Sequence, residues 1–307
     1  MTETRFVTAC FGLLFSVFAE LPAVAPGEPH TVLRADCALV LIPVHVTTAE
    51  GRSVTDLTRN DFRVSEDDIE QSIRHFSHDD APVSIGLLFD ISGSMRTKIQ
   101  KSLEAAAAFF KTSNEGDEFF LVEFNDRAKL SVGFTRDSGE LYQRIARAKP
   151  FGRTSLLDAI HLSLKEMKNA QNSRKALVIV SDGGDNCSRH KVREIKSTLL
   201  ESDVQVYAIG IFDRDESARK TREEKEGPEL LSALAEQSGG RHYPVDNLND
   251  LPPVSTQLGI DLRDEYLLGF SSSNAERDGK YRKVRVSLTS GAELRIFHRR
   301  GYYAPTE

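Results

Sequence analysis

An alternation of strand and helix patterns between Pro82 and Leu262 constrains the fold of this chain more than any other feature. Strand-like runs occur at Val83–Phe89, Glu118–Phe124, Ala128–Phe134, Lys175–Asp182 and Val204–Phe212. Helical patterns lie between and after them, at Ile99–Phe110, Glu140–Lys149, Ser155–Lys168, Val192–Glu201 and Pro228–Gly240. Repeated alternation of this kind predicts a doubly wound α/β fold, in which a mostly parallel sheet carries helices on both faces.

Strand patterns without helices flank this block on both sides. Ala38–Thr48 and Phe62–Phe76 come before it. Pro43 favours an edge position for the first, and a turn at Asp67-Asp68 divides the second into two strands. After the block come Glu265–Phe270, Tyr281–Leu288 and Glu293–Ala304. Because two or three strands bury too little alone, we expect the flanks to form one small β-sandwich around the inserted α/β domain; two independent β modules are the alternative.

The N-terminal end carries an apolar run, Phe6–Phe18, that is followed by the small residues Ala23-Val24-Ala25. A membrane-spanning helix needs about 20 apolar residues, whereas a shorter run before a small-x-small sequence is typical of a secretory signal. We expect export to the periplasm, the cell surface or the medium, with Ala19 as a second cleavage candidate and no membrane span in the mature chain. A retained membrane anchor is the alternative. The expected segments are a signal peptide at 1–25, an N-terminal β segment at 36–80, an α/β domain at 82–262 and a C-terminal β segment at 263–306.

Charge and cysteine usage exclude some functions. The net charge of −6 leaves no basic excess with which to displace counterions, so nucleic acid is not an expected partner. The segment Asp213–Gly227 is dense in both signs of charge and is expected to be a solvated loop. Cys10 would leave with the signal peptide, and Cys37 and Cys187 show no metal-ligand spacing. We expect these two to be solitary buried thiols, with a disulfide as the alternative.

Oxygen-bearing side chains gather in three loops that follow strands or precede a helix of the α/β block. They are Asp90, Ser92 and Ser94 in DISGSM, Thr154 in GRTS, and Asp182 in VSDGGDN. In an open α/β sheet, ligands bind beyond the carboxyl ends of the strands, so we expect these oxygens to meet there. Carboxylates and hydroxyls without histidine or thiolate are donors that suit Mg²⁺ or Mn²⁺ and disfavour zinc.

The charge balance of this set indicates what the ion would do. Two carboxylates neutralise a divalent cation, and hydroxyls add no charge, so the ion stays electrophilic. Mg²⁺ prefers octahedral coordination and keeps water in its open positions. A carboxylate from a protein partner, supplied by an aspartate or glutamate, would take one of these positions. The site is therefore expected to accept an acidic group.

Each of these residues has a simpler explanation. Ser92 and Ser94 would cap the helix that follows them. Thr154 or Ser155 would do the same for the next helix, and Asp182 with its glycines would form an ordinary strand-ending turn. The convergence of three loops on one sheet edge favours the metal site over these separate explanations.

The sequences DISGSM, GRTSLLDAI and VSDGGDN together resemble the three parts of the metal-ion-dependent adhesion site of von Willebrand factor type A domains. The likeness covers about residues 82–262, and the flanks are similar to a group of exported bacterial proteins related to this family. Gly184 departs from that group, which has an acidic residue there. The resemblance implies a protein-binding module in which a shift of the last helix, expected here around Asn247–Leu262, accompanies changes in affinity. By position it implies a metal bound by Asp90, Ser92, Ser94, Thr154 and Asp182.

Two other classes of function compete with binding. A hydrolase that forms an aspartyl phosphate would need a second acid where Ser92 stands, and the sequence lacks the serine-hydrolase, P-loop and dinucleotide fingerprints. A structural envelope protein whose metal only stiffens the fold is the other alternative. The sequence therefore predicts an exported, metal-dependent binding module that is not an enzyme.

Overall fold

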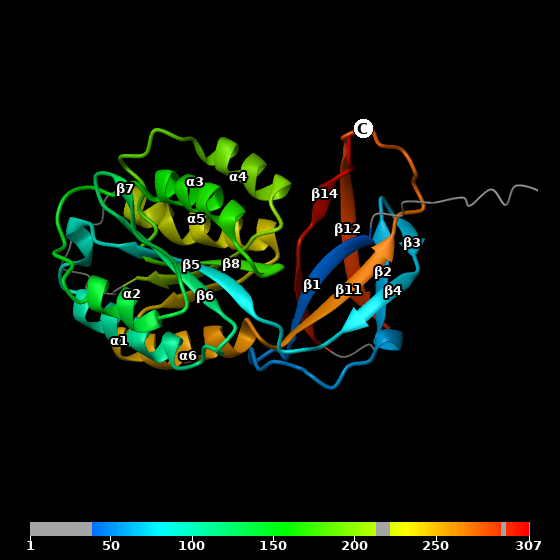
Figure 1. Cartoon of the computed structure of the whole chain (residues 1–307), viewed down its shortest axis with the longest axis horizontal. Helices are drawn as coiled ribbons and strands as arrows, with labels where there is room; N and C mark the ends of the chain where they lie inside the picture. Colours follow the sequence, from blue (N-terminus) through cyan, green and yellow to red (C-terminus); the bar gives the residue numbers. More distant parts are fainter. Residues whose placement is uncertain (1–38, 213–221, 290–292, 307) are drawn as a thin grey trace, which may run out of the picture. The chain divides into compact units, whose positions relative to one another are not determined.

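The computed structural model of the chain describes residues 39–212, 222–289 and 293–306 (Figure 1). The predicted signal peptide at 1–25, Cys37 and the greater part of the charged segment Asp213–Gly227 lie outside these residues. Within the described ranges, no helix is both long enough and apolar enough to cross a membrane.

A six-stranded sheet forms the centre of the α/β part, with the strand order β10-β9-β8-β5-β6-β7. The strands are β5 (Val83–Asp90), β6 (Glu118–Phe124), β7 (Ala128–Thr135), β8 (Arg174–Ser181), β9 (Gln205–Ile211) and β10 (His242–Val245). Neighbours pair in parallel except β7, which runs antiparallel to β6. The prediction of a mostly parallel sheet is therefore confirmed.

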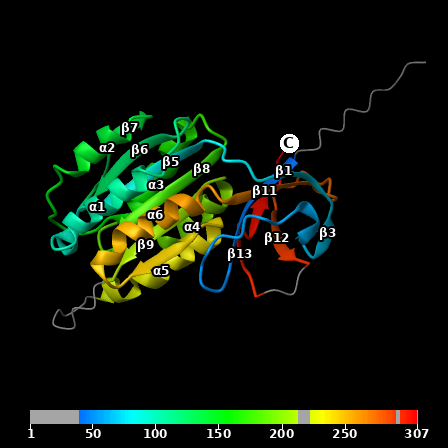
Figure 2. The ribbon, with the colours of Figure 1, turned by 90° about the horizontal axis from the view of Figure 1, so that it is seen from below.

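Helices cover both faces of this sheet (Figures 1 and 2). One face carries α1 (Ile99–Phe110), α2 (Ser138–Ile145) and α6 (Leu251–Asp261), and the other carries α3 (Leu156–Glu166), α4 (Val192–Glu201) and α5 (Arg222–Ser238). Ile85 and Leu87 of β5 pack into the first layer and Leu88 packs into the second. Because side chains alternate along a strand, a strand covered on both faces needs a nearly continuous apolar sequence.

The flanking strands form two four-stranded sheets, with the orders β13-β1-β11-β4 and β14-β12-β2-β3. Their strands are β1 (Leu39–Thr47), β2 (Phe62–Glu66), β3 (Ile69–Gln71), β4 (Ile73–Ser77), β11 (Glu265–Ser271), β12 (Tyr281–Leu288), β13 (Arg295–His298) and β14 (Gly301–Tyr303). Each sheet combines strands from before and after the α/β part, and residues of both sheets share one apolar cluster. The prediction that the two flanks join is confirmed in the pairing of their strands.

Several predicted strand boundaries were wrong. The segment Phe62–Phe76 holds three strands, although the turn at Asp67 and Asp68 is confirmed by their positive φ angles of 46° and 67°. Glu293–Ala304 holds β13 and β14, which belong to different sheets. A sequence pattern shows that such a segment is extended, but it does not show where the chain crosses from one sheet to the other.

The edge position predicted from Pro43 was also wrong, because β1 lies between β13 and β11. Pro43 pairs with Leu267 on the β11 side. On the other side β13 pairs with Val44 to Thr47 and does not reach Pro43. Proline is tolerated here because the second ladder begins one residue after it.

The predicted start of the helix at Pro228 was wrong as well. Helix α5 includes Arg222 to Gly227, with Pro228 inside it. The Arg222 and Glu226 side chains pair at 2.7 Å across one helical turn, which supports helix in a segment expected to be a loop. The last helix is confirmed as α6, preceded by a short 3-10 helix, η4 (Leu248–Asp250), and its prolines lie in the first turn.

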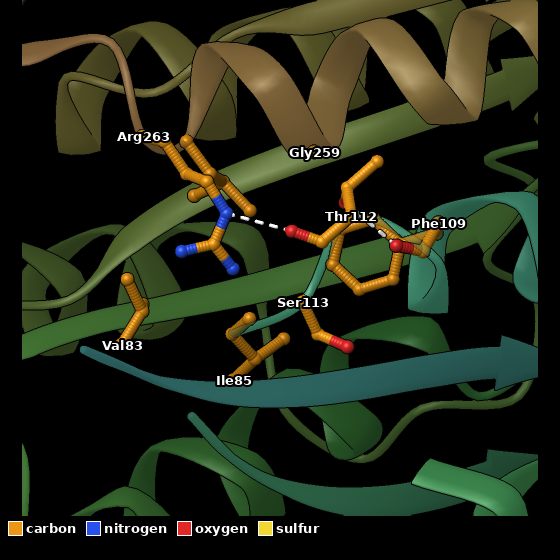
Figure 3. A pocket seen from close by; sticks show the side chains of 8 residues that line it. Val83, Ile85, Phe109, Thr112, Ser113, Gly259 and Arg263 are labelled. Carbon is orange, nitrogen blue, oxygen red and sulfur yellow. Dashed lines mark hydrogen bonds between the residues drawn. The ribbon is translucent and has the colours of Figure 1, made fainter. Parts of the chain in front are cut away.

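Helices α1 and α6 lie side by side on one face (Figure 2). At Gly259 a Cβ atom would lie 1.9 Å from Thr112 Oγ1, so only glycine permits this close approach. A pocket beside it is lined by Val83, Ile85, Phe109, Thr112, Ser113, Gly259, Leu262 and Arg263 (Figure 3). Arg263 Nε donates to the Thr112 carbonyl at 2.7 Å (Figure 3). This pocket lies at the amino end of β5, whereas the oxygen-bearing loops follow its carboxyl end.

Candidate metal centre

The two predicted carboxylates stand at the ends of adjacent strands. Asp90 is the last residue of β5, and Asp182 directly follows β8. These strands pair in parallel, with Phe89 opposite Val180. The fold therefore brings both side chains to the carboxyl edge of the sheet, as the sequence predicted.

Hydrogen bonds hold the first two predicted loops together. The Gly93 N–H, in the 3-10 helix η2 (Gly93–Met95), donates to the Gly152 carbonyl at 3.0 Å. The Phe151 N–H donates to the Ile91 carbonyl, also at 3.0 Å. The loop that carries Thr154 is thus fixed against the loop that carries the two serines.

The loop after β8 is fixed to the Thr154 loop in the same way. The Thr154 N–H donates to Asn186 Oδ1 at 2.9 Å, and the Asn186 N–H donates back to the Thr154 carbonyl at 3.1 Å. Gly183 in this loop has φ +78°, and a Cβ there would lie 2.7 Å from the Gly227 carbonyl oxygen. Only glycine can follow Asp182 without moving α5.

Burial makes the carboxylate pair electrostatically costly. Asp90 is 0 % exposed and Asp182 is 4 % exposed. Burial, which removes hydration, is the larger cause that raises the pKa of Asp90 to about 7, and the nearby Asp182 carboxylate is the second. Hydrogen bonds that favour the charged form oppose this rise. Those bonds come from Ser181 Oγ at 2.6 Å and the Ser92 N–H at 2.8 Å. When Asp90 is ionised, the pair carries more negative charge than the described surroundings neutralise.

Lys98 supplies the nearest positive charge. Its Nζ lies 3.2 Å from Asp182 Oδ2, and its side chain is largely buried. Within the described ranges, no other cationic side chain bonds either Asp90 or Asp182. Lys98 thus pairs with Asp182, and Asp90 has no cationic partner among the described residues.

The hydroxyls do not cap the helices beside them. Ser92 Oγ and Ser94 Oγ are 3.1 Å apart and share a hydrogen bond, and neither η2 nor α1 receives a side-chain cap. Ser155 occupies the N-cap position of α3 without using its side chain, and its buried hydroxyl has no partner in the described structure. The turn explanation for Asp182 holds in part, since its Oδ1 accepts from the Gly184 N–H at 3.4 Å.

The donor set fits a hard divalent cation. It combines two carboxylates with hydroxyls and contains no histidine or cysteine. Separately, no group of three or more His, Cys, Asp or Glu side chains suited to a metal occurs among the described residues. Mg²⁺ and Mn²⁺ prefer such oxygen donors. Asp90, Ser92, Ser94, Thr154 and Asp182 are the residues that would hold the ion.

A second polar cluster holds the loop after β8 against α3. Burial acts to raise the pKa of Asp158, but hydrogen bonds from the His190 ring and backbone lower it overall. His190 Nδ1 lies 2.6 Å from Asp158 Oδ1, and the His190 ring stacks on His161. Burial raises the pKa of Asp185, which accepts from Ser188 Oγ at 2.5 Å. These contacts give the two histidines structural partners.

Sequence reasoning missed two residues of the site, Lys98 and Ser181, and misjudged one cysteine. Ser181 stands beside Asp182 at the end of a strand, a signal that could have revealed it. Lys98 has no such signal, because its position depends on how the chain turns through η2. Cys187 is a free thiol, as predicted, but is half-buried, and its Sγ lies 3.4 Å from the Asp126 carbonyl.

Comparison with known proteins agrees with this geometry. Residues 85–184 match the family model of the von Willebrand factor type A domain. This span begins in β5 and ends two residues after Asp182, so it contains all the predicted metal-site residues. The α/β part therefore has a von Willebrand factor type A-like fold.

Individual relatives are distant. A solved structure of a von Willebrand factor type A protein from Catenulispora acidiphila is 13 % identical, with a TM-score of 0.52, covering 83 % of this chain and 76 % of its own. Proximal thread matrix protein 1 of the mussel byssus is 18 % identical, with a TM-score of 0.50, covering 64 % of this chain and 49 % of its own. The uncharacterised protein YwmC of Bacillus subtilis (strain 168) is 21 % identical over 202 residues, 59 % of this chain and 84 % of its own. At these identities the likeness extends to the fold alone.

Proposed function

We propose that this chain is an exported, divalent-cation-dependent protein-binding module of the adhesion type, with its flanking sheets packed as a small β-sandwich. Asp90, Ser92, Ser94, Thr154 and Asp182 would hold Mg²⁺ or Mn²⁺. When bound, the ion supplies an electrophilic centre that the carboxylate of a protein partner completes. The fold of the α/β part supports this proposal, and the site carries it.

The observation that carries the proposal is the unbalanced charge of two buried carboxylates. Asp90 and Asp182 lie at neighbouring strand ends, both almost fully buried. Lys98 is the one cationic side chain that contacts the pair in the described chain. A buried charge without a partner is strongly unfavourable, so the arrangement favours binding of a cation at this edge.

The other residues of the site orient the carboxylates. Ser181 Oγ and the Ser92 N–H each donate to one oxygen of Asp90. These bonds fix the carboxylate plane while the loops from α3 and β8 are held together through Asn186. Preorganised donors lower the cost of ordering the site when a ligand binds.

We propose no catalytic activity. A hydrolase would need a general base within hydrogen-bonding reach of a nucleophile. In the described structure Ser92 and Ser94 bond to each other, and His190 and His161 are engaged with Asp158 and with one another. The Ser92 hydroxyl also bonds the Asp90 carboxylate, which the proposal assigns to the metal, and no histidine bonds either serine hydroxyl within the described residues.

Thermal unfolding with Mg²⁺ tests the proposal. For wild type, Mg²⁺ at about 100 times its dissociation constant should add roughly 2.7 kcal/mol of stability. Asp182→Ala should abolish this gain, whereas Asp203→Ala, which changes an exposed aspartate, should keep it. An unchanged metal-induced shift in Asp182→Ala would defeat the assignment.

Partner capture separates adhesion from a metal that only stiffens the fold. Envelope fractions are passed over wild type and over Ser92→Ala/Ser94→Ala, each with Mg²⁺ and with EDTA. Capture by wild type in Mg²⁺ alone is the expected result. Equal capture with Mg²⁺ and EDTA would instead favour a purely stabilising metal.

A further inference from the structure

An exposed aromatic side chain lies beside the candidate metal centre. Phe151 is 56 % exposed, in the loop that leads to Thr154. Its N–H donates to the Ile91 carbonyl, and the carbonyl of the next residue, Gly152, accepts from the Gly93 N–H. The backbone on both sides of the ring is therefore fixed against the serine loop, so that an apolar group is displayed next to the site.

Exposed arginines come from four of the described loops at this edge, whereas the loop after β10 carries the exposed acids Asp246 and Asp250. The arginines are Arg96 after η2, Arg127 in the turn between β6 and β7, Arg153 before α3, and Arg189 in the loop after β8. The side chains of Arg96 and Arg127 make no hydrogen bond or ion pair within the described part of the chain. Arg189 is 90 % exposed and lies 3.5 Å from Asp158. Much of this positive charge is available to a partner.

Contacts between these loops show that they form one surface. The Arg153 N–H donates to Asp126 Oδ1 at 2.9 Å, which joins the turn between β6 and β7 to the Thr154 loop. The Asp126 carbonyl in turn lies 3.4 Å from Cys187 Sγ in the loop after β8. Arg127, next to Asp126, therefore belongs to the same surface as Arg153.

The local charge opposes the charge of the whole chain. The full sequence has a net charge of −6. In the described stretches 91–98, 125–127, 150–155 and 183–191, Asp126 is the one exposed acid, and it is paired with Arg153. A basic rim on an acidic protein attracts acidic partners and repels basic ones.

We propose that this rim, made of Phe151, Arg96, Arg127, Arg153 and Arg189, selects an acidic segment of a protein partner that carries an apolar residue beside the captured carboxylate. The inference rests on the proposed function. Arginine forks match carboxylates in two-point contacts, and aromatic and arginine side chains dominate the energetics of protein interfaces. An exposed phenyl ring among arginines thus fits an acidic peptide with an apolar side chain.

Labelled synthetic peptides test this specificity by fluorescence polarisation in Mg²⁺ and in EDTA. The parent peptide has the core Glu-Asp-Leu-Glu; one variant replaces Leu by Ser and another replaces both Glu by Gln. Wild type in Mg²⁺ should bind the parent about tenfold more tightly than either variant. Binding of the parent should weaken as salt rises.

Matched variants assign each preference to its part of the rim. Phe151→Ser should lose the preference for Leu and keep the preference for Glu, and Arg153→Gln/Arg189→Gln should do the opposite. Ile69→Ser and Arg285→Gln change side chains of similar exposure on the flanking sheets and should change neither preference.

Wild type with equal affinity for the three peptides, or with no affinity for the parent, overturns the inference. The Mg²⁺-induced melting shift without peptide judges the proposed function separately. If that shift is present but no peptide is preferred, the rim proposal alone fails. If the shift is absent, the metal site and the rim proposal fail together.

Discussion

Two of the regions in which the chain buries carboxylates differ in the partners of these groups. Where α6 leads into β11, Asp261 accepts from Arg241 at 2.8 Å and Tyr243 at 2.5 Å. Glu265 in β11 accepts from Arg174 at 2.9 Å, with Gln205 and Tyr207 as further donors. Each of these carboxylates has its own arginine and additional neutral donors.

The carboxyl edge of the central sheet lacks that balance. There Lys98 pairs with Asp182 alone, and no arginine contacts Asp90 or Asp182 in the described chain. Both regions are equally buried, so burial does not explain the difference. In the first region the chain itself supplies a counter-charge for each buried carboxylate. In the second region it does not, and this favours binding of a cation from solution. The predictions below test this contrast, from the largest expected effect to the smallest.

Removing Arg174, the partner of Glu265, should cause the largest loss of stability. Arg174→Met leaves Glu265 buried without its counter-charge, and breaking a buried ion pair costs about 3–5 kcal/mol. Urea unfolding should show this loss equally with Mg²⁺ and with EDTA. Arg63→Met, which changes an exposed arginine, is the control and should stay within about 0.5 kcal/mol of wild type. A loss that Mg²⁺ reverses would contradict the contrast.

Removing a carboxylate charge from the carboxyl edge of the central sheet should stabilise the fold instead of destabilising it. In EDTA at pH 8, Asp90→Asn removes the cost of a buried charge and its repulsion with Asp182, and it should stabilise the fold by the order of 2 kcal/mol. The sign follows from the pKa of Asp90, which the fold raises to about 7. Between about pH 4 and 7 only the folded state holds this proton, so the contribution of Asp90 to stability should fall with rising pH and then level off.

The stability difference between Asp90→Asn and wild type isolates this dependence from other titrating groups. Burial lowers the pKa of His242 to about 4, so His242 acts in the reverse direction, with stability lost as pH falls from about 6.5 to 4. Both proteins contain His242, and its effect cancels in the difference. A difference that does not change with pH would show that neither burial nor Asp182 raises the pKa of Asp90.

Replacing Lys98, which pairs with Asp182, should have the smallest effect. Lys98→Met removes the ammonium that competes for Asp182, so the affinity for Mg²⁺ should rise, by about fivefold for an interaction of roughly 1 kcal/mol. Titration calorimetry measures it, with Lys101→Met as the control because Lys101 is paired to Glu104 on the surface of α1. Weaker Mg²⁺ binding in Lys98→Met would mean that the lysine supports the ion.

The fold was largely predictable where burial leaves a strong pattern. Fully covered strands such as β5 need apolar residues at nearly every position, and helix α1 repeats them at helical spacing. Prediction failed where the pattern is weak: β13 and β14 were taken for one strand, and β1 for an edge strand. In those cases the outcome depends on which strands meet across the chain, and a local sequence does not encode that.

The candidate site was predictable for a related reason. Parallel strands place their carboxyl ends at one edge, so Asp90 and Asp182 could be brought together from their positions alone. The sequence could not show that the Ser92 and Ser155 hydroxyls leave the neighbouring helices uncapped, because this depends on how each loop is folded. Lys98 was missed because its approach to Asp182 depends on the path of the loop.

Manganese binding followed by electron paramagnetic resonance tests the central claim most directly, because Mn²⁺ prefers the same oxygen donors as Mg²⁺ and its free form is measured. The account predicts one tightly bound Mn²⁺ per wild-type chain, displaced by Mg²⁺ and lost in Asp90→Asn/Asp182→Asn. The same bound ion in the double variant, or none in wild type, would contradict it.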